Sequence, residues 1–143
     1  MTREIPSRFS GRCACGRVAY ECSSAPVSMV NCHCRDCQRA GGAAYAPSAV
    51  VSRAALRVTR GEPSWYAAAA DSGNEVRRAF CGHCGSPLFA ASSARPEFLV
   101  IRAGSLDDPS WFRAGADVWA ESAQPWDLMD DATPRFAKSR VRS

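Results

Sequence analysis

The chain has 143 residues and a mass of 15.4 kDa, which is the size of one ordinary domain. Hydrophobic residues make up 46% of the chain and charged residues 22%, and these near-average values argue against wholesale disorder and against a collagen-like or heptad-repeat rod. The formal net charge of +4, taken alone, is compatible with a nucleic-acid partner.

Two features of the sequence predict a cytoplasmic protein without a membrane partner. The residues before Phe9 contain no apolar stretch of the kind found in secretory signals, and no apolar run in the chain reaches membrane-spanning length. Cytosolic thiols stay reduced, so the 8 cysteines indicate metal binding or thiol chemistry rather than a disulfide framework.

Short strands dominate the predicted secondary structure. Apolar side chains alternate through Val18, Tyr20 and Cys22, which is the pattern of a half-buried strand. Further strands are predicted at residues 27–32, 45–51, 56–59, 75–80, 87–91 and 98–101. Because Gly, Pro, Ser and Asp turns separate these strands at short spacing, the sequence favours an antiparallel sandwich or barrel over a parallel sheet.

Very little helix is expected. Residues 34–40 can form one or two helical turns before the following pair of glycines ends them. Residues 65–70 are rich in alanine but lie between a proline and an Asp-Ser-Gly turn, so we interpret them as a strand or an irregular segment. Residues 106–109 predict a turn. The expected fold class is therefore mainly β.

Seven of the eight cysteines fall at spacings that suit metal chelation. The spacings are Cys13-x-Cys15, Cys32-x-Cys34-x-x-Cys37 and Cys81-x-x-Cys84. The first and last pairs, which we call the four-cysteine group, together supply the sulfurs of a closed tetrahedral zinc site. Such a site would join the N-terminal part of the chain to the middle of the sheet and stabilise the fold.

The three-cysteine group, Cys32, Cys34 and Cys37, comes from one contiguous segment. Structural zinc sites take four protein ligands and catalytic sites keep one position open, so we interpret these three cysteines as an open, catalytic zinc site. A zinc held by three thiolates can accept a substrate thiol as a nucleophile or a leaving group. The alternative is a second structural site, closed by Cys22, His33 or His83.

The residues near these cysteines have simpler interpretations. Cys22 suits the apolar strand face as a buried core thiol. Strand alternation turns His33 away from a metal held by its two neighbours, so we expect a structural role for it ahead of a substrate contact. No general base stands out, since His33 and Asp36 are candidates by proximity alone.

The metal sites change the charge balance of the chain. Seven thiolates and two zinc ions would lower the net charge from +4 to +1. The last basic residues lie in a segment without apolar periodicity, which predicts a solvated or disordered end rather than a nucleic-acid site; they are Arg135, Lys138, Arg140 and Arg142. We therefore divide the chain into a zinc domain at residues 9–127 and a basic tail at residues 128–143, with no nucleic-acid partner.

Four motifs of the chain occur together and in order, at residues 11–20, 32–39, 80–85 and 104–109. With Pro125 and Trp126 they resemble the glutathione-dependent formaldehyde-activating enzyme family, also called the centromere-protein-V-like domain family, over residues 9–127. The resemblance implies a mainly antiparallel β fold shared with Rab-chaperone zinc proteins and type-B methionine sulfoxide reductases. It also implies two zinc ions per chain, one on each cysteine group.

The resemblance further implies a reaction in which a carbon–sulfur bond forms and breaks. The named family activity condenses formaldehyde with glutathione to S-hydroxymethylglutathione. We therefore expect a zinc-dependent carbon–sulfur lyase that acts on an adduct between a small thiol, such as glutathione, and an aldehyde. The candidates to clamp the carboxylates of glutathione are Arg35, Arg39, Arg77 and Arg78.

Other hypotheses stay open at this point. Trp126 is a candidate lid over the open site, with simple packing as the alternative. The protein could instead be a non-enzymatic, zinc-stapled binding module, as the centromere-type and Rab-chaperone relatives suggest. A third hypothesis is a redox thiol protein that uses Cys22 or the pair Cys81 and Cys84.

Overall fold

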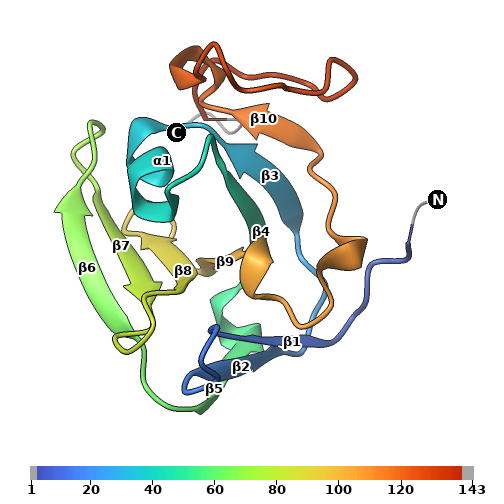
Figure 1. Ribbon diagram of the computed structural model, residues 1–143, viewed down its shortest axis with the longest axis vertical. Helices are drawn as coiled ribbons and strands as arrows, with labels where there is room; N and C mark the ends of the chain where they lie inside the picture. Colours follow the sequence, from blue (N-terminus) through green and yellow to red (C-terminus); the bar gives the residue numbers. More distant parts are fainter. Residues whose placement is uncertain (1–2, 140–143) are drawn as a thin grey trace.

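The computed structural model describes residues 3–139 and confirms that the protein is mainly β (Figure 1). The strands of a three-stranded sheet follow the order β1–β2–β5 and span Phe9–Arg12, Ala19–Cys22 and Leu56–Arg60. Those of a seven-stranded sheet follow the order β10–β3–β4–β9–β8–β7–β6 and span Ala116–Val118, Ser28–Cys32, Ala46–Ser52, Phe98–Arg102, Pro87–Ser92, Glu75–Phe80 and Ser64–Ala69.

One core lies between the two sheets. Tyr20 and Cys22 of β2 are almost fully buried, because alternate residues of a strand face the same side. The ring of Tyr20 packs edge-on against that of Phe89 on β8, with 5.0 Å between the ring centroids. Cys22 is therefore a core thiol, as its place in the strand pattern predicts.

The strands predicted from alternation are present, and three further strands complete the sheets. β1 and β10 are short and were missed, and the alanine-rich residues of β6 form a strand because they pair in register with β7, from Ser64 opposite Phe80 to Ala69 opposite Glu75. The pairing between named strands is antiparallel except between β10 and β3, which run parallel.

The helix α1 spans Arg35–Gly41, where the sequence predicts one or two turns. It begins at Cys34, whose sulfur accepts a hydrogen bond from the Cys37 amide, and it ends at Gly42, whose φ of 66° is left-handed. Short 3-10 turns occur at Arg53–Ala55, Ala103–Ser105, Pro109–Trp111 and Ala120–Ser122. No helix within residues 3–139 is long and apolar enough to cross a membrane.

Arg135 and Lys138 of the basic tail are exposed, in line with the solvated alternative of the prediction, but the backbone beside them is held by hydrogen bonds. The Phe136 amide donates to the carbonyl of Asp117, and the amides of Asp117 and Trp119 donate to the carbonyls of Pro134 and Lys138. These backbone bonds place residues 134–138 along β10, at the end of the molecule opposite the small sheet (Figure 1). Arg140 and Arg142 lie outside the described residues.

Candidate metal centres and the pocket between them

The four-cysteine group is assembled from two turns that are far apart in the sequence. Cys13 and Cys15 follow β1, and Cys81 and Cys84 follow β7. Each turn closes on a glycine with a left-handed φ of 78°: Gly16 donates its amide hydrogen to the Cys13 carbonyl, and Gly85 donates to the Cys81 carbonyl. A larger side chain would be strained at either glycine.

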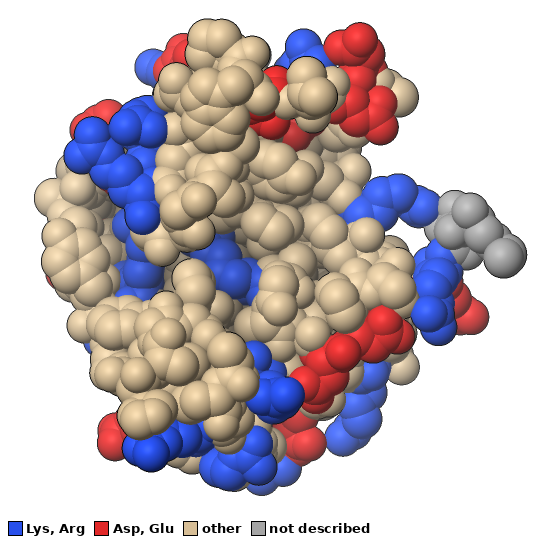
Figure 2. All heavy atoms as spheres, in the orientation of Figure 1, with Lys and Arg blue, Asp and Glu red and all other residues tan. Residues whose placement is uncertain are grey.

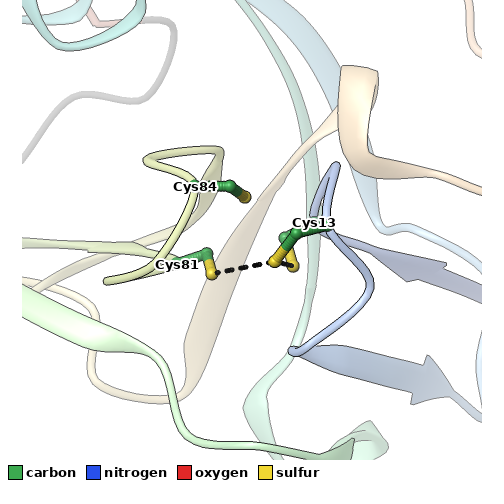
Figure 3. A group of neighbouring side chains, drawn as sticks. Cys13, Cys81 and Cys84 are labelled. Atoms are coloured by element: carbon green, nitrogen blue, oxygen red, sulfur yellow. Dashed lines mark hydrogen bonds between the residues drawn. The ribbon is translucent and has the colours of Figure 1, made fainter.

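The sulfurs of the four-cysteine group face one another, and all four lie within 4.8 Å of each other. The Sγ–Sγ distance is 3.6 Å between Cys13 and Cys15 and 3.8 Å between Cys15 and Cys81. Figure 3 shows Cys81 and Cys84 on one loop with their sulfurs directed toward the loop that carries Cys13. Tetrahedral Zn²⁺ with bonds of about 2.3 Å needs sulfurs about 3.7 Å apart, so the group fits this metal.

Hydrogen-bond donors also point at these sulfurs. The Val18 amide donates to Cys13 Sγ at 3.3 Å, and the His83 amide donates to Cys81 Sγ at 3.4 Å. Hydrogen bonds from Ser86 lower the pKa of Cys84 to about 5. Donors of this kind stabilise thiolates, which are the form of cysteine that binds a metal.

The three-cysteine group lies where β3 ends and α1 begins. Cys32 ends β3, Cys34 caps α1 and Cys37 lies within α1, and their sulfurs lie within 4.8 Å of one another. Contacts from Cys32 and Cys34, followed by the charges of Arg102 and Arg78, lower the pKa of Cys37 to about 2 although burial opposes them. Three soft sulfur ligands suit zinc. No His, Asp, Glu or further Cys among the described residues completes this group.

His33 does not join either group, although it stands between two of the cysteines. Its side chain is fully buried, and Nε2 forms a hydrogen bond of 2.7 Å with Oδ1 of Asp117. Oδ2 of Asp127 lies 2.8 Å from Nδ1 but outside hydrogen-bond geometry. The predicted structural role of His33 is therefore confirmed. Of the two aspartates, Asp117 has a weak signal in the sequence, because it lies between the apolar residues Ala116 and Val118.

Gln38 connects the three-cysteine group to the C-terminal part of the chain. Its Nε2 donates to the carbonyl of His33 at 2.7 Å and to the carbonyl of Ser122 at 3.0 Å. Together with the aspartates around His33, these bonds hold the Cys32–Cys37 segment against residues 117–127. Sequence spacing could not reveal this connection, because the partners are 84 residues apart.

A pocket of about 720 Å³ lies between the two groups. Cys13 of the four-cysteine group and Cys37 of the three-cysteine group both line it. Its wall includes four aromatic side chains, Tyr45, Tyr66, Phe80 and Phe89, and three arginines, Arg12, Arg78 and Arg102. Figure 2 shows a hollow near the middle of this face with basic side chains inside it. Asp107 is the carboxylate among the described lining residues, and Ser10 donates to it.

Of the arginines predicted to bind the carboxylates of glutathione, only Arg78 lines the pocket. Arg78 lines it, whereas Arg77 lies on the opposite strand face with its guanidinium 4.9 Å from the centre of the Trp65 ring. Arg35 donates to Gln38 instead. The structure adds Arg12 and Arg102, which sequence reasoning missed because arginines are common in this chain.

Several other candidates also lie outside the pocket. They are Arg39, Asp36, Trp126, Cys22, His33 and His83. Trp126 is 66% exposed, so the structure does not show it as a lid. The base candidates Asp36 and His33 do not reach the pocket wall.

Comparisons with known proteins found a matching family model and a similar solved structure. A family model described as glutathione-dependent formaldehyde-activating enzyme matches residues 8–122 of the chain. No curated protein sequence matches it significantly. A crystal structure of a protein from Rhodobacter sphaeroides is similar, with a TM-score of 0.59 and 22% identity over 90% of this chain and 100% of that chain. At this identity the likeness concerns the fold alone.

Proposed function

Because the chain belongs to the glutathione-dependent formaldehyde-activating enzyme family, we propose that it is a zinc-dependent carbon–sulfur lyase. Its substrate is the adduct of a small aldehyde and a small thiol such as glutathione. One observation carries this proposal: the three-cysteine group lacks a fourth described ligand, and its member Cys37 lines the large pocket. An open metal position beside a pocket is the arrangement that catalysis on a bound substrate requires.

The two cysteine groups have different roles in this proposal. Cys13, Cys15, Cys81 and Cys84 would hold a structural zinc, and Cys32, Cys34 and Cys37 would hold the catalytic one. When bound there, zinc supplies Lewis acidity that keeps a thiol ionised near neutral pH and stabilises it as a leaving group.

The chain's own residues position the substrate. The pocket volume lies within the range of about 300–1,000 Å³ that is usual for small-molecule sites. Tyr45, Phe80 and Phe89 give it apolar walls, and Arg78 and Arg102 add positive charge near Cys37. A bound thiolate would lie close to an aldehyde held against these walls.

The reaction balances without a cofactor that carries electrons. In the forward direction the sulfur loses its proton and attacks the carbonyl carbon, a carbon–sulfur bond forms, and the carbonyl oxygen takes up a proton. In the reverse direction that bond breaks and the thiolate leaves. Since neither Asp36 nor His33 lines the pocket, we assign no protein base and propose that solvent exchanges the protons.

The test combines zinc content with an exchange measurement. Nuclear magnetic resonance can follow the exchange between glutathione and formaldehyde with and without the full chain. We expect the wild type to hold two zinc ions and to accelerate exchange. Cys37→Ser should hold one and lose the acceleration, while the control Cys22→Ala, which changes a thiol outside both groups, should keep both properties. Exchange that the wild type leaves unaltered with several thiols and aldehydes would overturn the proposal.

A binding module is the second candidate, and one observation favours it. Trp126 and Leu128 are 66% and 96% exposed and lie two residues apart, although large apolar side chains are usually covered. Cross-linking from this segment should then recover a partner protein. In either case we propose a cytoplasmic location, because none of the eight cysteines, all of which are described, forms a disulfide.

A further inference from the structure

Two arginines line the same pocket as Cys37 of the three-cysteine group, and neither has a carboxylate partner among the described residues. Nη2 of Arg102 lies 3.8 Å from Sγ of Cys37. Nε of Arg78 is buried and has no hydrogen-bond partner among the described residues. Neither guanidinium forms an ion pair within residues 3–139. Both side chains are half-buried, and a buried donor such as Nε of Arg78 is costly to leave without an acceptor.

Strand pairing places both arginines on one face of the large sheet. Arg78 of β7 is opposite Ala90, and Ala90 is opposite Val100 of β9. Arg102 follows Val100 by two residues, and positions two apart on a strand face the same side. Both side chains consequently reach the pocket into which Cys37 projects from α1.

Arg102 is also held in a fixed position. Its Nη1 donates to Oγ of Ser48 at 2.7 Å, and Ser48 is buried on the neighbouring strand β4. Its backbone carbonyl accepts a hydrogen bond of 2.8 Å from Ser105. The guanidinium therefore stays beside the sulfur of Cys37 without having to be ordered when a ligand binds.

A zinc centre on the three cysteines would have a net negative charge that these arginines could compensate. A divalent zinc held by three thiolates has one net negative charge, and a fourth thiolate raises this to two. Collecting two negative charges in a half-buried site is unfavourable unless positive charges lie near. Arg78 and Arg102 supply two, whereas Arg12 donates to the carbonyls of Cys13 and Ala14 at the other group.

We propose that Arg78 and Arg102 select the fourth ligand of the three-cysteine centre, favouring a thiolate sulfur over a neutral ligand. This inference rests on the proposed function, because it concerns thiol binding at the same centre. In this inference the two arginines compensate the negative charge on the sulfur of the bound thiol, and they do not bind a carboxylate elsewhere on it. They are positioning residues that act through Cys37 and the metal.

The two assignments make different predictions for two thiols. 2-Mercaptoethanol has no carboxylate, whereas glutathione has two. If the arginines compensate sulfur charge, replacing one should weaken the binding of both thiols by the same factor. If they clamp a substrate carboxylate, the replacement should weaken the binding of glutathione alone.

The experiment uses the full chain reconstituted with cobalt(II), whose absorption bands report a new thiolate ligand. Subtracting the spectrum of Cys37→Ser removes the signal of the four-cysteine group. Arg102→Gln and Arg78→Gln keep hydrogen-bond donors but remove the charge. The matched control is Arg77→Gln, which removes the same charge from the adjacent residue on the opposite face of β7.

We expect each glutamine variant to bind both thiols about tenfold more weakly, the effect of one favourable charge contact in a partly solvated site. Arg102→Lys should recover most of the affinity, and Arg77→Gln should match the wild type. Cobalt content and thermal unfolding check that each variant is folded.

Three outcomes would overturn the inference. Equal affinities in the wild type and both glutamine variants would remove the role of the charges. A loss confined to glutathione would assign the arginines to its carboxylates. An Arg102→Lys variant as weak as Arg102→Gln would assign Arg102 to hydrogen-bond geometry instead. If the wild type binds neither thiol, the proposed function itself fails; if it binds both, a negative result in the variants concerns this inference alone.

Discussion

The two cysteine groups use the same ligand chemistry in opposite ways. The four-cysteine group joins turns that are 66 residues apart, and its four sulfurs leave no place for another ligand. The three-cysteine group comes from residues 32–37 and has three sulfurs, and its member Cys37 lines the pocket. In the proposed function, a zinc on the first group would stabilise the fold, and a zinc on the second would exchange a ligand while the chain stays folded.

The groups also differ in what surrounds them. Backbone amides and Ser86 surround the four-cysteine group, so its environment is set by the local turns. The three-cysteine group depends on distant residues: the two aspartates around His33, Ser122 through Gln38, and Arg102. Its geometry should therefore respond to changes elsewhere in the protein.

The largest expected difference between the groups concerns folding. Structural zinc contributes roughly 10–16 kcal/mol in small domains, comparable with the entire unfolding free energy of about 5–15 kcal/mol. Cys81→Ser should therefore abolish cooperative thermal unfolding, which circular dichroism can measure. Cys37→Ser should unfold cooperatively and retain one zinc by elemental analysis. A folded Cys81→Ser with normal stability would contradict the comparison.

Removal of the buried acid beside His33 should have the next largest effect. Asp117→Ala leaves a buried imidazole without its hydrogen-bond partner and should lower the unfolding free energy by about 3 kcal/mol. It should also weaken zinc binding at the three-cysteine group, because His33 lies between two of its ligands.

Denaturant unfolding and chelator competition measure these two effects of Asp117→Ala. The control is Asp131→Ala, which removes an exposed acid paired with Arg135 on the same C-terminal segment and should change neither quantity. Equal zinc loss at both cysteine groups would show that Asp117 has no selective influence on the three-cysteine group.

A chelator added in increasing amounts should remove the zinc ions from the two groups one after the other. A zinc with three protein ligands is held by one ligand fewer than a zinc with four, so we expect a chelator to remove the zinc proposed for the three-cysteine group first, without a change in the melting temperature. Loss of the second zinc should coincide with unfolding. Zinc release recorded beside circular dichroism tests this order, and simultaneous release of both ions with unfolding would contradict it.

The smallest predicted effect is a change in stability from losing a hydrogen bond that involves no residue of either cysteine group. Tyr20→Phe removes the buried hydrogen bond of 2.6 Å between the Tyr20 and Ser105 hydroxyls, which should cost about 1 kcal/mol. The zinc content should stay the same as in the wild type, because neither hydroxyl contacts a cysteine sulfur. Chemical denaturation gives the change in stability. A loss of zinc would mean that the small sheet controls a metal centre.

Alternation and turn chemistry predicted most of the strands, and the exceptions have physical reasons. β10 is only three residues long, so its alternation of Ala, Asp and Val is too short to indicate a strand. β1 contains Gly11, where a side chain would lie 2.2 Å from the hydroxyl of Tyr20, so packing and not strand preference decides that residue. β6 is rich in alanine, and its pairing with β7 overrides the helix preference of those residues.

The order of the cysteines along the chain determined which sulfurs could meet, because short spacings leave a chain few ways to bend. The two groups found in the structure contain the same residues that spacing predicted, while their roles as structural and catalytic centres stay predictions. Tertiary structure alone decided what each group faces. Arg102 reaches Cys37, and Asp117 and Asp127 reach His33, only through strand pairing and the return of the C-terminal segment, which no local sequence pattern encodes.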